Sequence, residues 1–170
     1  MNIDEYDAVI YDLDGTLVRL VVDWDHVAHE VGAVLESRGV EPPEDLWTML
    51  ERAEETGHHE AVEETIARHE HEGAQHSERL SHADGIPYGM PVGVCSLNCE
   101  AACHIALETH DLTDHVSSVV GRDSVATKKP DPEPLLTVVR ELGAVPERTL
   151  FVGDSERDEV TAERAGTDFR

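Results

Sequence analysis

The chain has 170 residues, with 37 Asp and Glu against 13 Lys and Arg, so its formal net charge is 13 − 37 = −24. The acidic residues are spread along the chain, which excludes nucleic acid as a partner because a polyphosphate would be repelled. No apolar run approaches the length of a membrane span, and no basic segment followed by an apolar stretch opens the chain. We therefore expect a cytoplasmic protein with no membrane partner, built as one domain or as a core with a small insertion.

The basic residues are almost all arginine, because Lys128 and Lys129 are the only lysines. Dispersed carboxylates destabilise a compact chain by mutual repulsion in dilute salt, whereas concentrated salt screens that repulsion. The acidic charge and the scarcity of lysine therefore predict a halophilic protein. The alternative interpretation is an ordinary acidic protein.

The first half of the chain begins with one strand and continues with helices. Residues 6–11 (YDAVIY) form a short apolar run that ends abruptly in polar residues 12–16, as expected of a buried strand followed by a turn. Residues 24–73 show helical spacing and no strand pattern. Three helices are expected there: one from Trp24 to a stop at Gly39, one through residues 46–50, and one around residues 61–66.

In the second half, short apolar runs alternate with helical patterns. The expected elements are strands at residues 91–95, 116–120 and 149–152, and helices at residues 100–109, 133–142 and 157–165. This alternation predicts an α/β fold with a Rossmann-like parallel sheet and helices on both faces. Right-handed crossovers place the carboxyl ends of all strands at one edge of the sheet, where open α/β sheets bind their ligands.

Polar side chains gather at that edge. They are Asp12 and Asp14 after the first strand, Ser96 and Asn98 after the second, Lys129 in the loop after residues 116–120, and Asp154 and Asp158 after residues 149–152. Carboxylates that face one another repel unless a cation lies among them, and hard oxygen ligands favour magnesium over zinc. A lysine and a hydroxyl directed at the same point add what a phosphate needs. The sequence therefore predicts a magnesium-dependent phosphoryl-transfer site, in which one carboxylate attacks and another donates a proton.

Four segments carry a family resemblance. DLDGT, CSLN, KPDP and VGDSERD, at residues 12–16, 95–98, 129–132 and 152–158, resemble in order the four motifs of the haloacid dehalogenase superfamily. The phosphoglycolate phosphatase-like branch is the most similar, and the resemblance covers residues 5–19 and about 91–166. It implies a phosphatase that hydrolyses a small phosphorylated metabolite through an aspartyl-phosphate, with Mg²⁺ as cofactor.

The resemblance also implies the role of each residue. Asp12 would be the nucleophile, and Asp14 would protonate the leaving group and then activate the hydrolytic water. Ser96 would hydrogen-bond the transferring phosphoryl group, and Lys129 would balance its charge. Asn98 would join Ser96 and Lys129 in binding phosphate.

The metal ligands implied by the resemblance come from the same carboxylates. Asp12, the backbone carbonyl of Asp14, and Asp154 would hold the magnesium ion, with Asp158 in support. A dehalogenase would not need the acid/base carboxylate, so the presence of Asp14 favours phosphoryl chemistry. A phosphomutase, a phosphonatase and a degenerate, non-catalytic binding protein remain open as alternatives.

The helices fall where the family carries a small cap. The resemblance implies a helical cap at residues 20–82, inserted after the first strand of a catalytic core formed by residues 1–19 and 83–170. Two departures stand out. Residues 81–91 (SHADGIPYGMP) contain too much Gly and Pro for the helix that is usual there, and Arg170 follows the fourth motif where the family often adds another strand.

Other residue patterns fit structural roles. Cys95, Cys99 and Cys103 match no zinc pattern and are expected to be buried thiols. The histidines, including His69, lie mostly among glutamates on helical stretches, so we expect them to be solvated. A calcium loop with Gly15 at its sixth position would lack both essential acids, which excludes an EF-hand.

Overall fold

The computed structural model describes residues 2–170, and its centre is a five-stranded parallel sheet. The strands lie in the order β5-β4-β1-β6-β7, and β1 is paired on both sides, so that Ile10 lies between Gly93 of β4 and Phe151 of β6. The strands are β1 (Ala8–Tyr11), β4 (Val92–Cys95), β5 (Ser118–Val120), β6 (Thr149–Val152) and β7 (Asp168–Phe169).

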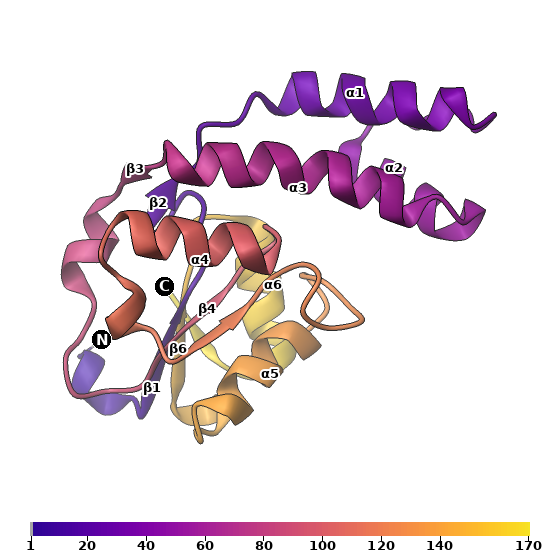
Figure 1. Cartoon of the computed structure of the whole chain (residues 1–170). Helices are drawn as coiled ribbons and strands as arrows, with labels where there is room; N and C mark the ends of the chain where they lie inside the picture. The colour runs from indigo at the N-terminus through magenta and orange to yellow at the C-terminus, as the bar shows by residue number, and fades with distance from the viewer. Residues whose placement is uncertain (1) are drawn as a thin grey trace.

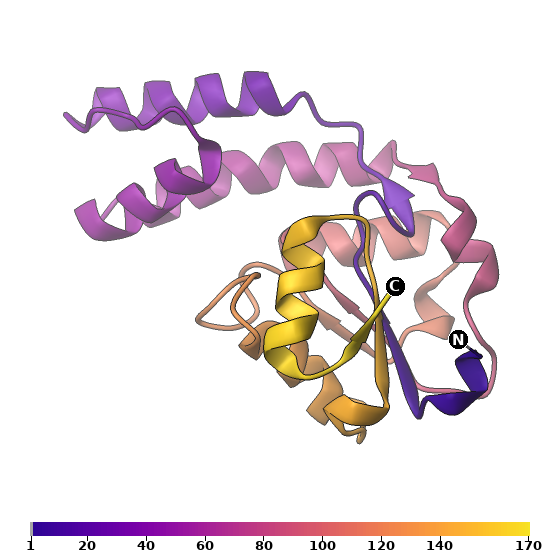
Figure 2. The same ribbon diagram turned by 180° about the vertical axis from the view of Figure 1, so that it is seen from behind.

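Helices cover both faces of this sheet, which confirms the predicted α/β fold (Figures 1 and 2). One face packs against α4 (Glu100–Thr109) through a core that includes Val9 and Ala106. The other face packs against α5 (Glu133–Glu141) and α6 (Glu156–Ala165) through a core that includes Ile10 and Val138. Side chains alternate between the two faces along β1, so a continuous apolar run is what a strand covered on both sides requires.

Three further helices project beyond the sheet: α1 (Trp24–Ser37), α2 (Leu46–Thr56) and α3 (His59–Gln75) (Figure 1). They share an apolar cluster of their own, in which Val31, Leu50 and Ile66 are fully or almost fully buried. Aspartates cap two of them: Asp23 accepts a hydrogen bond from the His26 N–H, and Asp45 accepts one from the Thr48 N–H.

The segments that connect the sheet to these helices form a two-stranded ribbon, which the sequence pattern does not predict. β2 (Val18–Arg19) pairs antiparallel with β3 (Glu78–Arg79). Each strand has only two residues, which is too short for alternation to be visible in the sequence.

Two expectations about the second half can be compared with the structure. Residues 81–91 contain only a 3₁₀ turn, Ser81–Gly85, as their Gly and Pro content predicts. The sequence left the completeness of the sheet after the fourth motif open, and the structure has a strand there: β7 pairs with β6, and the Arg170 N–H donates to the Phe151 carbonyl at 3.0 Å. Within residues 2–170, no helix combines the length and apolarity needed to cross a bilayer.

Candidate active site

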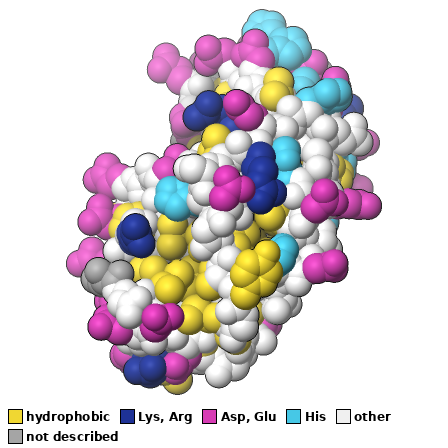
Figure 3. Space-filling view, turned by 90° about the vertical axis from the view of Figure 1, so that its left-hand side faces the viewer, with side chains coloured by type: hydrophobic (Ala, Val, Ile, Leu, Met, Phe, Trp, Pro, Cys, Tyr) yellow, Lys and Arg dark blue, Asp and Glu magenta, His cyan; other side chains and the backbone are white. Residues whose placement is uncertain are grey.

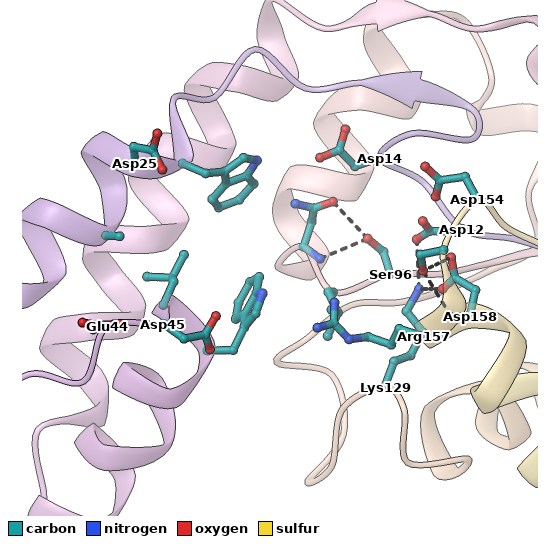
Figure 4. A pocket seen from close by; sticks show the side chains of 17 residues that line it. Asp12, Asp14, Asp25, Glu44, Asp45, Ser96, Lys129, Asp154, Arg157 and Asp158 are labelled. Atoms are coloured by element: carbon teal, nitrogen blue, oxygen red, sulfur yellow. Dashed lines mark hydrogen bonds and ion pairs between the residues drawn. The ribbon is translucent and has the colours of Figure 1, made fainter.

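A cavity of about 500 Å³ lies between the carboxyl ends of β1, β4 and β6 and the helices α1 and α2 (Figure 4). All seven polar residues that the sequence places at the sheet edge line it: Asp12, Asp14, Ser96, Asn98, Lys129, Asp154 and Asp158. The facing wall comes from residues that the sequence pattern does not single out as functional, chiefly Trp24, Asp25, Glu44, Asp45 and Trp47. The parallel sheet therefore brings the expected residues to one place.

Asp12 and Asp14 are presented by the turn that follows β1. The Asp12 N–H donates to the Val152 carbonyl at 2.8 Å, which continues the β1–β6 pairing and fixes the direction of this carboxylate. Asp12 is buried, whereas Asp14 is half-buried and accepts a hydrogen bond from the Leu20 N–H at 3.0 Å. Burial raises the pKa of Asp14, with nearby carboxylates adding to the effect and the Leu20 hydrogen bond opposing it.

Lys129 is a buried cation with three acceptors. Its Nζ donates to Asp12 Oδ1 at 3.0 Å, to Asp158 Oδ1 at 2.6 Å and to the Cys95 carbonyl at 3.1 Å. Burial alone would lower the pKa of Lys129, but Asp12 and Asp158 hold it above its usual range, so the ammonium stays charged. All three protons of the ammonium can therefore be satisfied at this point in the sheet edge.

Asp12, Asp154 and Asp158 form an all-oxygen cluster whose ligand atoms lie within 4.8 Å of one another. Burial raises the pKa of Asp12 to about 6, with Lys129 acting against this and Asp158 reinforcing it. One ammonium does not neutralise three carboxylates, and hard oxygen donors at this spacing fit a magnesium ion.

Gly15 makes room for one member of this cluster. A Cβ at Gly15 would lie 2.2 Å from Asp154 Oδ2, and the residue has a φ of +91°, so both the space and the backbone conformation require glycine. The glycine of the DLDGT segment therefore lets the Asp154 carboxylate approach the turn that carries Asp12.

Asp158 belongs to the cluster by distance, but both of its oxygens already have partners. Oδ1 accepts from Lys129, and Oδ2 accepts from the Ser155 hydroxyl at 2.8 Å. Ser155 is also the N-cap of α6, since its hydroxyl accepts from the Asp158 N–H. This arrangement makes Asp158 the residue that holds Lys129 in place.

Ser96 and Asn98 form a tight turn after β4, and both are buried. The Ser96 hydroxyl donates to Asn98 Oδ1 at 3.1 Å and accepts from the Asn98 N–H at 3.0 Å. The Asn98 amide also donates to Glu70 Oε2 at 2.8 Å, so this side chain supports Ser96 from behind.

Glu70 leads to a network that the sequence pattern does not reveal. Glu70 lies on α3 and is completely buried, and it binds Arg122 at 2.7 and 2.9 Å. Arg122 follows β5, is buried as well, and donates to Glu63 and to the Leu97 carbonyl. The available signals were the seven-residue spacing of the two glutamates on α3 and an arginine at the sheet edge. Both were hidden among the many charged residues of the chain.

The cysteines and histidines can also be placed. Cys95, Cys99 and Cys103 are buried, as expected, and burial raises the pKa of Cys95 and of Cys99 to about 12, which keeps both thiols protonated. Many histidines are exposed. His69 departs from the expectation of solvated positions, because its side chain is only 18% exposed and it hydrogen-bonds Glu30 at 2.7 Å.

Comparison with known proteins finds one family model and several curated proteins that are similar to this chain. A family model described as haloacid dehalogenase-like hydrolase matches residues 9–170. Phosphoglycolate phosphatase of Rhodospirillum rubrum is 41% identical over 78 residues, which cover 46% of this chain and 32% of that protein. The corresponding protein of Salmonella typhimurium is 52% identical over 60 residues, which cover 35% of this chain and 24% of its own length. The matched segments thus span about a third or less of these relatives.

Solved structures resemble the whole chain. A HAD-superfamily hydrolase of subfamily IA from Geobacter sulfurreducens superposes with a TM-score of 0.61 at 25% identity, covering 96% of this chain and 88% of that one. CbbY from Rhodobacter sphaeroides, solved in complex with phosphate, gives a TM-score of 0.69 at 20% identity over 96% and 84% of the two chains. At 20% identity, the similarity to CbbY shows a shared fold only.

Proposed function

Because the chain belongs to the haloacid dehalogenase-like hydrolase family, we propose that it is a magnesium-dependent phosphatase acting on a small phosphorylated metabolite through an aspartyl-phosphate at Asp12. The observation that carries this proposal is the position of the Asp12 carboxylate. It faces the cavity, Lys129 holds one of its oxygens, and Asp154 lies beside it. A buried carboxylate supported in this way has the position that a nucleophile needs.

The reaction would have two steps. In the first, an oxygen of Asp12 attacks phosphorus while the bond from phosphorus to the leaving oxygen breaks, and Asp14 gives that oxygen its proton. In the second, Asp14 takes a proton from a water molecule as the water oxygen attacks phosphorus, which releases inorganic phosphate and restores Asp12. The raised pKa of Asp14 supports the first role, because an acid must hold a proton at working pH.

Other residues would bind the phosphoryl group. Lys129 balances the charge that the phosphoryl oxygens bring beside Asp12. The Ser96 hydroxyl has one proton, which would turn from Asn98 Oδ1 to one of these oxygens while Ser96 still accepts from the Asn98 N–H. Asn98 orients Ser96, while Asp158 orients Lys129. Asn98 therefore acts in phosphate binding through Ser96.

A magnesium ion would be held by Asp12, Asp154 and the backbone carbonyl of Asp14. When bound, it neutralises charge on the transferring group. Asp158 would lie behind these ligands, since Lys129 and Ser155 occupy its oxygens. This division gives a separate role to each of the three carboxylates in the cluster, of which Asp12 and Asp158 contact Lys129.

We further propose that residues 20–82 act as a cap over a core of residues 1–19 and 83–170. The separate apolar cluster of α1, α2 and α3 supports this division. Trp24 and Trp47, with ring centroids 6.2 Å apart, would then contact the leaving group from the side opposite Asp12.

The test is release of inorganic phosphate from a panel of phosphorylated metabolites, with phosphoglycolate and an aryl phosphate included and Mg²⁺ in excess. Asp12→Asn should lower kcat at least about a thousandfold, a loss of about 4 kcal/mol of transition-state stabilisation, because an amide is isosteric but a poor nucleophile.

Asp4→Asn is the matched control, since Asp4 is an exposed carboxylate near the N-terminus and outside the cavity. Circular dichroism should show both variants folded. Turnover by Asp12→Asn above about a tenth of the unsubstituted rate would rule out Asp12 as the nucleophile.

A further inference from the structure

A second cluster of metal-ligating side chains lies on the projecting helices, away from the all-oxygen cluster. His26 and Glu30 are one turn apart on α1, and His69 faces them from the neighbouring helix α3. Their ligand atoms lie within 4.8 Å of one another. The two helices run side by side in both ribbon views (Figures 1 and 2).

One of the distances between these side chains matches that expected around a tetrahedral ion, and another is shorter. Zinc binds imidazole nitrogen and carboxylate oxygen at about 2.0–2.2 Å, which places neighbouring ligand atoms about 3.4 Å apart. His26 Nε2 lies 3.4 Å from Glu30 Oε1. His69 Nε2 lies 2.7 Å from Glu30 Oε2, so this hydrogen bond would lengthen as the ion replaces its proton.

The cluster already attracts cations. Arg68 also contacts Glu30 Oε2, at 3.0 Å, but its side chain is 62% exposed and can turn away into solvent. The net charge of −24 favours a divalent cation over an extra anion anywhere on this surface.

We propose that His26, Glu30 and His69 form a binding site for a first-row transition ion such as Zn²⁺, with water completing its coordination. The donor set separates this site from the magnesium site: imidazole nitrogen suits zinc, cobalt, nickel and copper, whereas Asp12, Asp154 and Asp158 offer only oxygen. The site does not depend on the proposed phosphatase activity.

A bound ion would link α1 to α3. α1 begins at Trp24, and both Trp24 and Asp25 line the cavity, while the residue that follows His69 on α3 is the buried Glu70. The link would therefore fix the wall of the cavity relative to the helix that is tied to the sheet. It should also raise the melting temperature, and the rise should grow with the logarithm of the free metal concentration once that concentration exceeds the Kd.

The experiment uses Co²⁺ as a spectroscopic probe on the full chain, with Mg²⁺ held in excess. The unsubstituted protein should bind one equivalent with the visible absorption of tetrahedral cobalt–nitrogen coordination. A double variant, His26→Ala with His69→Ala, should bind at least about tenfold more weakly, since even loss of residues that only support metal ligands costs that much.

Matched controls separate this site from the remaining histidines and from the all-oxygen cluster. His29→Ala with His71→Ala removes two histidines from the same two helices but none from the site, and should leave Co²⁺ binding unchanged. Asp154→Asn should leave it unchanged too. Glu30→Gln, which keeps the side-chain shape, serves if the histidine variant does not fold, and should weaken binding in the same way.

Equal Co²⁺ affinity in the unsubstituted protein and the His26/His69 or Glu30 variants would overturn the proposal. Loss of the signal in Asp154→Asn would overturn it as well, because the ion would then lie in the all-oxygen cluster. A rise in melting temperature with Zn²⁺ in the unsubstituted protein but not in the His26/His69 variant would support it.

Discussion

Lys129 neutralises only part of the carboxylate charge around it. It donates to Asp12 and Asp158, while Asp154 lies on the exposed side of the cluster with no cation assigned to it in the described structure. Removing one partner from a buried ion pair leaves a charge without compensation, which costs several kcal/mol. Asp158 therefore matters for the charge state of Lys129 as Asp12 does, although only Asp12 would react in the proposed mechanism.

The raised pKa of Asp12 predicts how magnesium binding depends on pH. Between the ordinary value of 3.8 and the raised value of about 6, Asp12 in the folded protein holds a proton that would otherwise be lost, and this proton competes with the cation. The affinity for Mg²⁺ should reach its maximum above about pH 7, where Asp12 is ionised, and should fall as the pH drops through about 6. Only about a tenth of Asp12 is ionised at about pH 5, so the Kd for Mg²⁺ should rise about tenfold.

Calorimetric titration of Mg²⁺ at several pH values, in constant salt, measures this dependence. In Asp12→Asn the affinity should be lower throughout and the step near pH 6 should be absent, because the amide does not titrate in this range. An unchanged Kd between about pH 5 and about pH 7 in the unsubstituted protein would contradict the assignment of Asp12 as a ligand.

The residues that the sequence could place are those with a short local signature. DLDGT puts Asp12 at the sheet edge because it directly follows a recognisable strand, and KPDP marks Lys129 in the loop that follows β5. Glu70 and Arg122 could not be found in this way. Their partnership depends on α3 packing on α4 beside the sheet, and their spacing of 52 residues gives no pattern in an acidic sequence.

At the scale of elements, α3 connects the projecting helices to the edge of the sheet that lines the cavity. It packs on α1 and α2 within the apolar cluster that these three helices share, and on α4 beside the sheet. Glu70 on its buried side reaches both Asn98 and Arg122, so the hydrogen bonds of the Ser96 turn continue directly into this helix. Movement of α3 relative to the sheet would therefore disturb Ser96.

Glu70→Gln tests this connection. The glutamine keeps the shape of the side chain but places an N–H₂ group near Arg122 and removes the charge that pairs with it. We expect the free energy of unfolding to fall by about 3 kcal/mol, the scale for breaking a buried ion pair. Urea denaturation measures the change.

Glu64→Gln is the control for this variant, because Glu64 lies on the same helix and is exposed. Its effect should stay within about 0.5 kcal/mol. If Glu70→Gln also stayed within about 0.5 kcal/mol, Glu63 alone would be sufficient for Arg122, and α3 would be tied to the sheet by apolar packing.

The long helices and strands could be predicted because each carries a repeated local pattern, which the two-residue strands do not have. α1 carries several turns of apolar spacing and an Asp cap, and β6 is a continuous apolar run. By contrast, the β2–β3 ribbon and β7 offer two residues per strand and exist because neighbouring backbone groups supply hydrogen bonds. Tertiary pairing, which no local pattern records, decides such strands.

At the scale of the whole molecule, charge is the dominant feature. Asp and Glu side chains are scattered over the face in Figure 3 and outnumber Lys and Arg there, rather than forming one patch. With 37 acidic and 13 basic residues, most carboxylates cannot have a cation of their own. Exposed ion pairs contribute little in any case, so the surface as a whole must be destabilising in dilute salt.

We propose on this basis that the protein is adapted to high salt, and that its melting temperature rises steeply with potassium chloride into the molar range. The screening length is about 30 Å at 0.01 M, so most carboxylates on the domain repel one another. It falls to about 3 Å at 1 M, where only adjacent groups still interact.

Magnesium could imitate part of this effect by occupying the cluster of Asp12, Asp154 and Asp158, so the titration must be run at fixed, saturating Mg²⁺. A melting temperature that stayed flat between about 0.1 M and about 2 M salt would show that the charge is not an adaptation to salt. The phosphatase proposal would be unaffected, because it depends on the family and on the residues at the sheet edge.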